Sequence, residues 1–247
     1  MAKIGIFDSG VGGLSVFREI YKLLPGEDYV YFADNAHCPY GEKTPEYIRD
    51  RACTIASDMT DRGVQAIVVA CNTATSAAIS TLRKKFDIPF VGMEPAIKPA
   101  VQGTRTGIVG VLATKGTLNG AKYHGIKGQY GADVRIVESV GDGFVELVES
   151  GCTDGPAAEA VVERSLRPIL DAGADVVVLG CTHYPFLLTV LQKIAGSSVR
   201  FIDPAPAIAK RLYDLLSSQG IQFSGREEGS REYIASGNPD VLNSMKW

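Results

Sequence analysis

Six short apolar runs, separated by segments with helical spacing, constrain the fold of this chain more than any other feature of its sequence. Each run is a few residues long and rich in Val, Ile, Phe or Tyr. Such near-continuous apolar strands are typical of parallel sheets, which helices cover on both faces. The predicted strands span residues 3–7, 29–33, 65–70, 106–111, 133–138 and 175–180.

Helical spacing fills several of the gaps between these runs, which predicts an α/β protein. Residues 12–24, 44–63 and 155–173 have this spacing, and the last of these segments begins with Asp154 as a predicted N-cap before Pro156. A proline-containing junction near 95–103 divides the chain, and a second junction follows residue 201. One more predicted strand, 231–236, is able to complete either sheet.

Length, charge and hydropathy exclude several classes of protein. The 247 residues suffice for one large domain or two small ones, and the net charge of −3 gives no basic footprint for nucleic acid. No apolar stretch approaches the roughly 20 residues that a membrane span needs. The first residues contain no separate apolar leader that ends in a cleavage site, so we expect a cytoplasmic protein.

Five widely spaced cysteines and three histidines predict neither a disulfide framework nor a structural zinc site. His37 and Cys38 are adjacent, but they lack further metal ligands nearby, so no metal is expected. Cys53 and His124 lie in helical or loop context and are expected to be structural.

The other unusual feature is a strand end that occurs twice. In "VVACNTATSAA" and "VVLGCTHYPFL", an apolar run ends at a cysteine, Cys71 or Cys181, and then continues as a predicted helix. Ligands of parallel sheets gather at the carboxyl ends of the strands, so both thiols are expected there. A helix N-terminus lowers the pKa of a thiol, which predicts thiolate character for both cysteines.

Two related halves that each present one thiol to a shared crevice would place the thiols on opposite faces of a ligand. A racemase or epimerase that uses two bases requires this arrangement, because one group removes a proton and the other returns it from the opposite side. Asn72, Thr73, Thr182 and His183 follow the cysteines and offer donors for an anionic ligand, and His183 is also placed to handle a proton.

Two further strand ends supply candidate residues. Asp8 and Ser9 follow the first strand; Asp8 is predicted to orient or deprotonate Cys71, or alternatively to cap the next helix, and Ser9 to bind a carboxylate. The glycines that follow do not complete the dinucleotide pattern G-x-G-x-x-G, because Ser15 holds its third glycine position. After the second strand, Tyr40 and Gly41 are predicted to form a turn whose amides face the ligand.

Six ordered motifs resemble those of the glutamate racemases, cofactor-independent members of the aspartate/glutamate racemase superfamily. They are "IFDSGVGGLSV", "YFADNAHCPYG", "VVACNTATSAA", "GVLATKGTL", "VVLGCTHYPFL" and "IDPA", and the resemblance extends from residue 4 to about residue 240. It implies two similar three-layer α/β domains with mainly parallel sheets that face each other across a cleft. The first would comprise residues 1–96 and 205–247, and the second 97–204.

The resemblance also implies an isomerase that interconverts L- and D-glutamate without a cofactor or metal and supplies D-glutamate for peptidoglycan. Cys71 and Cys181 would then be the proton acceptor and donor, Asp8 would assist the first, and His183 and Glu149 the second. A homodimer is a further expectation from the family. The implied substrate contacts are Asp8, Ser9, Tyr40, Gly41, Asn72, Thr73, Thr182 and His183, with Thr75, Thr114 and Thr117 as weaker candidates.

Three alternatives remain at the level of sequence. An aspartate racemase of the same superfamily would use the same thiols on a shorter substrate. A cysteine hydrolase or a thiol redox protein would use one nucleophile or a disulfide pair. A non-catalytic binding module would bind glutamate without exchanging its α-hydrogen.

Overall fold

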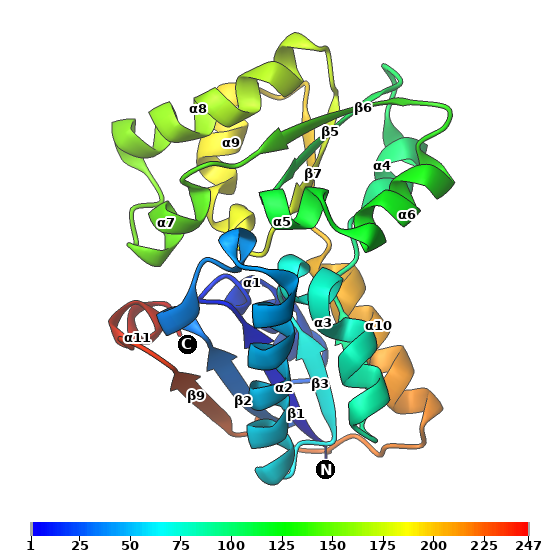
Figure 1. The fold of residues 1–247 in the computed structure, drawn as a ribbon, viewed down its shortest axis with the longest axis vertical. Coiled ribbons are helices and arrows are strands. Elements are labelled where there is room, and N and C mark those ends of the chain that lie inside the picture. Colours follow the sequence, from blue (N-terminus) through cyan, green and yellow to red (C-terminus); the bar gives the residue numbers. More distant parts are fainter. Residues whose placement is uncertain (1, 247) are drawn as a thin grey trace.

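The structure, a computed structural model that describes residues 2–246, contains two α/β units stacked one above the other (Figure 1). Each unit is built on one sheet, and every pair of neighbouring strands is parallel. The predicted fold class is confirmed. The apolar runs form parallel strands because helices bury them on both faces.

The first sheet has the strand order β4-β3-β1-β2-β9. Two helices, α1 (Leu14–Leu23) and α10 (Ala205–Ser218), pack together on one side, and α2 (Pro45–Asp61) and α3 (Asn72–Lys85) pack together on the other (Figure 1). The strands are β1 (Lys3–Asp8), β2 (Asp28–Ala33), β3 (Ala66–Val69), β4 (Phe90–Gly92) and β9 (Arg231–Ala235).

The second sheet has the strand order β6-β5-β7-β8. Its strands are β5 (Ile108–Ala113), β6 (Arg135–Val140), β7 (Val176–Gly180) and β8 (Arg200–Ile202). The larger helices that cover it are α8 (Gly155–Asp171) with α9 (Leu188–Ala195), and α4 (Ile97–Gly103) with α6 (Ala121–Tyr130). The remaining helices are α5 (Lys115–Leu118), α7 (Phe144–Glu149), α11 (Asp240–Met245) and the 3-10 turns η1 (Asn35–His37), η2 (Tyr40–Glu42) and η3 (Tyr184–Leu187).

The sequence pattern did not predict two of the strands, β4 and β8. Both have three residues and lie at the edge of a sheet, so they are too short to show a run or an alternation. The predicted strand 231–236 is β9, which pairs with β2 in the first sheet. Asp154 does occupy the N-cap of α8, but its side chain makes no capping hydrogen bond, contrary to the expectation.

The apolar core is continuous from one unit to the other. One cluster of buried residues includes Ile4 and Ile6 of the first sheet together with Val177 and Leu179 of the second. The chain returns from the second unit through α10, which packs on α1. The exact domain boundaries at residues 96 and 205 stay a prediction.

Asp175 fixes the segment through which the chain enters the second sheet. Its carboxylate accepts hydrogen bonds from the Thr104 hydroxyl (2.5 Å), the Arg105 main-chain N–H (2.8 Å) and the Thr106 hydroxyl (3.1 Å). Burial raises the pKa of Asp175, but these hydrogen bonds outweigh it and lower the pKa to about 2. The ionised carboxylate therefore stabilises the folded state.

Replacing Asp175 by asparagine is expected to lower the free energy of unfolding by about 1–3 kcal/mol near neutral pH. The folded-state pKa lies below the unfolded value of about 3.9, so this contribution is complete above pH ~4 and is lost as the pH falls towards 2. Urea denaturation at pH 7 and pH 3 measures both effects. Asp171→Asn, at an exposed position, is the control, and equal stability of the two variants at pH 7 would contradict the role of Asp175.

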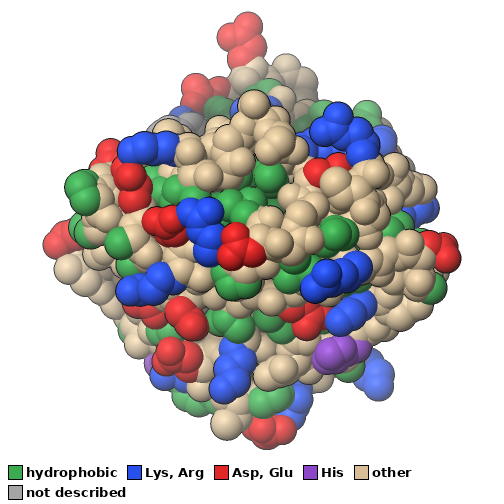
Figure 2. All heavy atoms as spheres, turned by 90° about the horizontal axis from the view of Figure 1, so that it is seen from above, with side chains coloured by type: hydrophobic (Ala, Val, Ile, Leu, Met, Phe, Trp, Pro, Cys, Tyr) green, Lys and Arg blue, Asp and Glu red, His purple; other side chains and the backbone are tan. Residues whose placement is uncertain are grey.

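Within residues 2–246, no helix combines the length and the apolar composition that crossing a membrane requires. Figure 2 looks down on the second unit and shows acidic and basic side chains interspersed on that face. A continuous basic surface for nucleic acid is not present on this face, in agreement with the net charge of −3.

Candidate active site

Cys71 lies where the first sheet meets the second unit, just after β3. It is the N-cap residue of α3, and its Sγ accepts a hydrogen bond from the Ala74 main-chain N–H at 3.4 Å. The thiol also lies 3.9 Å from the Ser9 hydroxyl oxygen, towards which it donates. The helix N-terminus thus holds this sulfur in place, as the sequence predicts.

The pKa of Cys71 differs from the expectation. Burial raises it strongly, the nearby Asp8 charge raises it further, and the hydrogen bond from Ala74 lowers it by less. The predicted lowering of this pKa is therefore wrong. A helix N-terminus stabilises a thiolate, but complete burial among apolar groups and beside a carboxylate costs more.

Cys181 directly follows β7, and it is buried beside the imidazole of His183. Pro185 follows within the 3-10 turn η3, so an α-helix does not begin at this cysteine as it does at Cys71. The sulfur lies 3.7 Å from Nδ1 of His183, whose Nε2 lies 2.6 Å from Oε1 of Glu149 in α7. The three side chains form a relay from carboxylate to imidazole to thiol, which agrees with their predicted proximity.

His183 is buried, and its pKa reflects two opposing effects. Burial lowers the pKa, but hydrogen bonds to Cys181, Cys38 and Glu149 outweigh it and hold the pKa well above its usual value. These contacts favour the protonated form of the imidazole, whose Nδ1 faces the sulfur of Cys181.

The glycine-rich loop after β1 allows side chains of the second unit to lie close to its backbone. The Val11 main-chain N–H donates to Oε1 of Glu149 at 2.7 Å. A Cβ at Gly10 would lie 1.8 Å from the same oxygen, and a Cβ at Gly12 would lie 2.3 Å from Nδ1 of His183. These glycines therefore make room for the two side chains that stand behind Cys181.

Replacing Gly10 by alanine is expected to reduce catalytic efficiency by about 10- to 100-fold, because the new methyl group displaces Glu149 and breaks its charge-assisted hydrogen bonds. Folding should change little, since Gly10 is not among the glycines with positive φ. Steady-state kinetics and thermal melting measure the two effects. Gly125→Ala adds its Cβ in open space and is the control; equal kinetics of the two variants would refute this role of Gly10.

The two thiols line one small cavity between the units. Its volume is about 10 Å³, and its wall includes both Cys71 and Cys181. The wall also contains most of the predicted substrate contacts. The other residues of the wall are Ser9, Pro39, Tyr40, Gly41, Asn72, Thr73, Thr114, Val145, Thr182 and His183.

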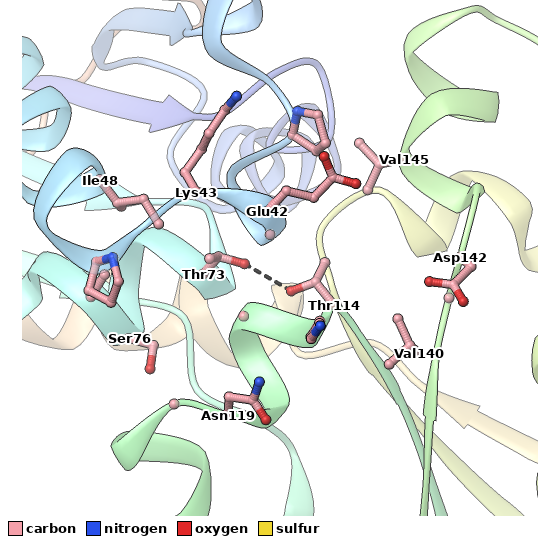
Figure 3. A pocket seen from close by; sticks show the side chains of 18 of the residues that line it. Glu42, Lys43, Ile48, Thr73, Ser76, Thr114, Asn119, Val140, Asp142 and Val145 are labelled. Atoms are coloured by element: carbon pink, nitrogen blue, oxygen red, sulfur yellow. Dashed lines mark hydrogen bonds between the residues drawn. The ribbon is translucent and has the colours of Figure 1, made fainter.

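A larger cleft of about 680 Å³ adjoins this inner cavity, and the two share several wall residues. Figure 3 shows Thr73 of the first unit facing Thr114 of the second across this cleft, joined by a hydrogen bond of 2.9 Å between their hydroxyl oxygens. Val145 of α7 also borders both spaces. The shared residues form the neck between the cleft and the thiols.

Asp8 lies behind the cavity wall. It is fully buried, and its carboxylate accepts hydrogen bonds from the Gly10 main-chain N–H at 3.0 Å and from the Thr182 hydroxyl at 3.2 Å. The N-cap of α1 is Gly13, without a capping side chain, so the alternative role of Asp8 as a helix cap is not observed. Burial raises the pKa of Asp8, while the nearby His183 opposes that shift.

Three of the residues predicted to contact the substrate have hydroxyl groups that bond to other parts of the protein. The Thr75 hydroxyl donates to Val69 O at 3.1 Å and accepts from the Met93 N–H at 2.9 Å, so it joins the strands β3 and β4. Thr117 bonds to the hydroxyl of Thr114 and stands outside the cavity wall. Tyr40 lines the cavity, but its hydroxyl donates to Asp34.

The structure also adds residues that sequence reasoning missed. Asp34 is fully buried, and Arg51 donates to both of its carboxylate oxygens, so this pair holds the loop that carries Tyr40. Cys38, in the same loop, approaches His183 instead of pairing with His37, which bonds to Tyr47. The sequence places Cys38 beside Tyr40 but gives no sign of a neighbour in the other unit.

Two parallel sheets, each with one thiol at the carboxyl end of a strand and both thiols on one cavity wall, form the arrangement that a two-base amino-acid racemase requires. A family model described as Asp/Glu/hydantoin racemase matches residues 4–212. A glutamate racemase from Stutzerimonas stutzeri is 45% identical over 242 residues, which cover 98% of this chain and 91% of that protein. The chain therefore belongs to the glutamate racemase family.

Solved structures agree with this assignment. A glutamate racemase isoform from Bacillus anthracis superposes with a TM-score of 0.89 at 29% identity, covering 99% of this chain and 92% of that one. The Escherichia coli glutamate racemase, in complex with L-glutamate and the activator UDP-MurNAc-ala, has a TM-score of 0.82 at 35% identity and covers 94% of this chain and 98% of that one.

Proposed function

We propose that this protein interconverts L- and D-glutamate by proton transfer between two thiols, without a cofactor. The observation that carries the proposal is the position of Cys71 and Cys181 on the wall of one cavity, each at the end of a strand from a different sheet. Membership of the glutamate racemase family supports glutamate as the substrate.

The reaction divides between the two sides of the cavity. In one direction, the thiolate of one cysteine takes the α-proton of glutamate, and the thiol of the other donates a proton to the opposite face of the carbanion. In the reverse direction the roles exchange. We assign His183 to supply and accept the proton of Cys181, Glu149 to orient that imidazole, and Asp8 to adjust the charge balance at Cys71.

Asn72 is the clearest candidate for binding the substrate. Its side chain is buried on the cavity wall, and neither its amide oxygen nor its amide nitrogen has a hydrogen-bond partner within the described chain. An unpaired buried amide is costly, and a substrate carboxylate would satisfy its N–H groups. Ser9, Thr73 and Thr182 provide further hydroxyl groups on the same wall.

Substrate binding also accounts for how the buried thiol of Cys71 becomes a base. Burial raises the pKa of the Cys71 thiol. The α-ammonium group of bound glutamate would add a positive charge beside the sulfur and favour the thiolate. Donors on the substrate carboxylate would stabilise the carbanion, and closure of the units would exclude water.

The units must separate for glutamate to enter. The inner cavity of about 10 Å³ has room for about one water molecule, and glutamate is far larger. The adjoining cleft of about 680 Å³ provides the route, and the hydrogen bond between Thr73 and Thr114 must open on that route. The substrate therefore binds as the units part and reacts after they close.

A cysteine hydrolase remains a second candidate because of one observation. A cysteine hydrolase needs a nucleophile, a base and a carboxylate that orients the base. The contacts from Cys181 to His183 and from His183 to Glu149 have this order. A hydrolase mechanism gives Cys71 no role, although Cys71 lines the same cavity as Cys181. An aspartate racemase is disfavoured, because a glutamate racemase is 45% identical over 98% of this chain. The likeness to the aspartate racemase of Picrophilus torridus, 18% identical with a TM-score of 0.60, extends to the fold alone.

The decisive experiment incubates each pure enantiomer of glutamate with the protein in deuterated water without added cofactor. We expect deuterium at the α-carbon, first in the newly formed enantiomer, because the donating thiol exchanges with solvent. Aspartate serves as the comparison substrate. Loss of optical rotation only after addition of pyridoxal phosphate, or binding of glutamate without α-hydrogen exchange, would rule the proposal out.

The cellular role follows from the family. We propose that the protein acts in the cytoplasm and supplies D-glutamate for peptidoglycan synthesis. The homodimer expected from the family stays a prediction.

A further inference from the structure

A third thiol, that of Cys38, lies outside the proton-transfer scheme but against one of its members. One oxygen of Glu149, one ring nitrogen of His183 and the sulfur of Cys38 all lie within 4.8 Å of one another. Cys38 belongs to the loop after β2 in the first unit, whereas Glu149 ends α7 and His183 follows β7 in the second. Three separate segments thus bring sulfur, nitrogen and oxygen donors to one point.

This donor set matches a thiophilic divalent cation. Zinc binds cysteine sulfur, histidine nitrogen and carboxylate oxygen, whereas calcium and magnesium prefer oxygen ligands alone. Tetrahedral zinc, with bonds of about 2.0–2.3 Å, would hold its ligand atoms roughly 3.2–3.8 Å apart. The 2.6 Å contact between His183 and Glu149 would lengthen to reach that range. The sulfur of Cys38 has at most a short distance to move inward.

We propose that Cys38, Glu149 and His183 form an inhibitory binding site for zinc or a similar thiophilic divalent cation. On binding, three water ligands of the ion, the thiol proton of Cys38 and the Nε2 proton of His183 leave to solvent. Three bonds from the protein to the metal replace the three metal–water bonds, and the hydrogen bond between His183 and Glu149 breaks. The ion connects the two units and fixes the imidazole that faces Cys181. The inhibition rests on the proposed racemase function, whereas the binding does not.

The position of the proposed ion relative to the thiol cavity indicates that it would inhibit the reaction. Cys38 is absent from the wall of the thiol cavity and His183 is part of it, so the ion would bind beside the reacting centre. It would nevertheless withdraw His183 from proton transfer. It would also oppose the separation of the units through which glutamate enters.

The test is a titration of the full-length protein with Co²⁺, which gives a thiolate-to-cobalt absorption band when a cysteine coordinates it. We expect one such site, and Cys38→Ala should remove the band and weaken cobalt binding at least tenfold. Cys53→Ala is the matched control, because Cys53 is also half-buried, belongs to the first unit and lies in α2 away from this cluster. Thermal melting of both variants establishes that each is folded.

Zinc inhibition is measured in parallel. Zinc should inhibit racemisation by the unaltered protein, a chelator should restore activity, and Cys38→Ala should be at least tenfold less sensitive than Cys53→Ala. A cobalt band that persists without Cys38 would overturn the site, and binding without inhibition would overturn its inhibitory role. If the protein racemises nothing but the cobalt band depends on Cys38, the proposed function fails while the metal site stands.

Discussion

Replacing either Cys71 or Cys181 by serine is expected to reduce kcat/KM for racemisation by about 10³-fold, within the range for loss of a general acid or base. An alcohol is a far weaker acid than a thiol, so serine neither forms the base nor readily returns the proton. Both cysteines line one cavity, and in the proposed mechanism each serves one face of the α-carbon. Circular dichroism of the reacting amino acid measures the rate from each enantiomer.

For each variant, kcat/KM must fall by the same factor from L- to D-glutamate as from D- to L-glutamate. L- and D-glutamate have the same free energy in water, so the ratio of kcat/KM for the two directions remains one, whichever thiol is removed. Cys53→Ser and Cys152→Ser are the controls, because these thiols lie outside the cavity wall. A serine variant of either cavity cysteine that keeps nearly full activity would show that one base suffices.

Replacing His183 by asparagine is expected to lower kcat by about 10²-fold or more, the range for loss of a proton-transfer group. Asparagine keeps a polar group beside Cys181 but cannot carry the proton that the imidazole exchanges with the thiol; Nδ1 of His183 lies 3.7 Å from the sulfur. Glu149→Gln should have a smaller effect, since the amide can still contact the imidazole but no longer carries a charge.

The pattern of the kinetic constants distinguishes this role from a structural one. If His183 acts in proton transfer, kcat falls while KM changes little, and the melting temperature of the variant stays close to that of the unaltered protein. Steady-state kinetics and thermal melting measure these quantities. A large rise in KM with unchanged kcat would mean that His183 serves to bind the substrate instead.

One physical reason explains why the sequence predicted both the parallel strands and the positions of the two cysteines. A run such as residues 65–70 is apolar throughout because helices bury both of its faces, and in a parallel sheet the residue after it lies at the ligand-binding edge. Cys71 and Cys181 could therefore be placed before their surroundings were known. The strands β4 and β8 could not, because three residues carry no periodicity.

What the sequence could not supply depends on contacts between distant segments. Thr75 looked like a substrate contact because of its motif, but its hydroxyl bonds to two main-chain groups. The pKa of Cys71 depends on how completely the site is buried, which no local pattern reveals. Arg51 of α2 holds Asp34 of the loop after β2, and Cys38 of the first unit lies close to His183 of the second. Neither pairing leaves a signal in residue spacing.

Besides its contact with His183, Glu149 accepts a hydrogen bond from the main-chain N–H of Val11, so this contact does not depend on the side chain at position 11. Every amino acid except proline carries the same N–H, so exchange of the residue at position 11 preserves the interaction. Packing alone then limits which side chains are accepted there, since Val11 is fully buried. An evolutionary comparison that tracks side-chain identity would overlook this contact between the units.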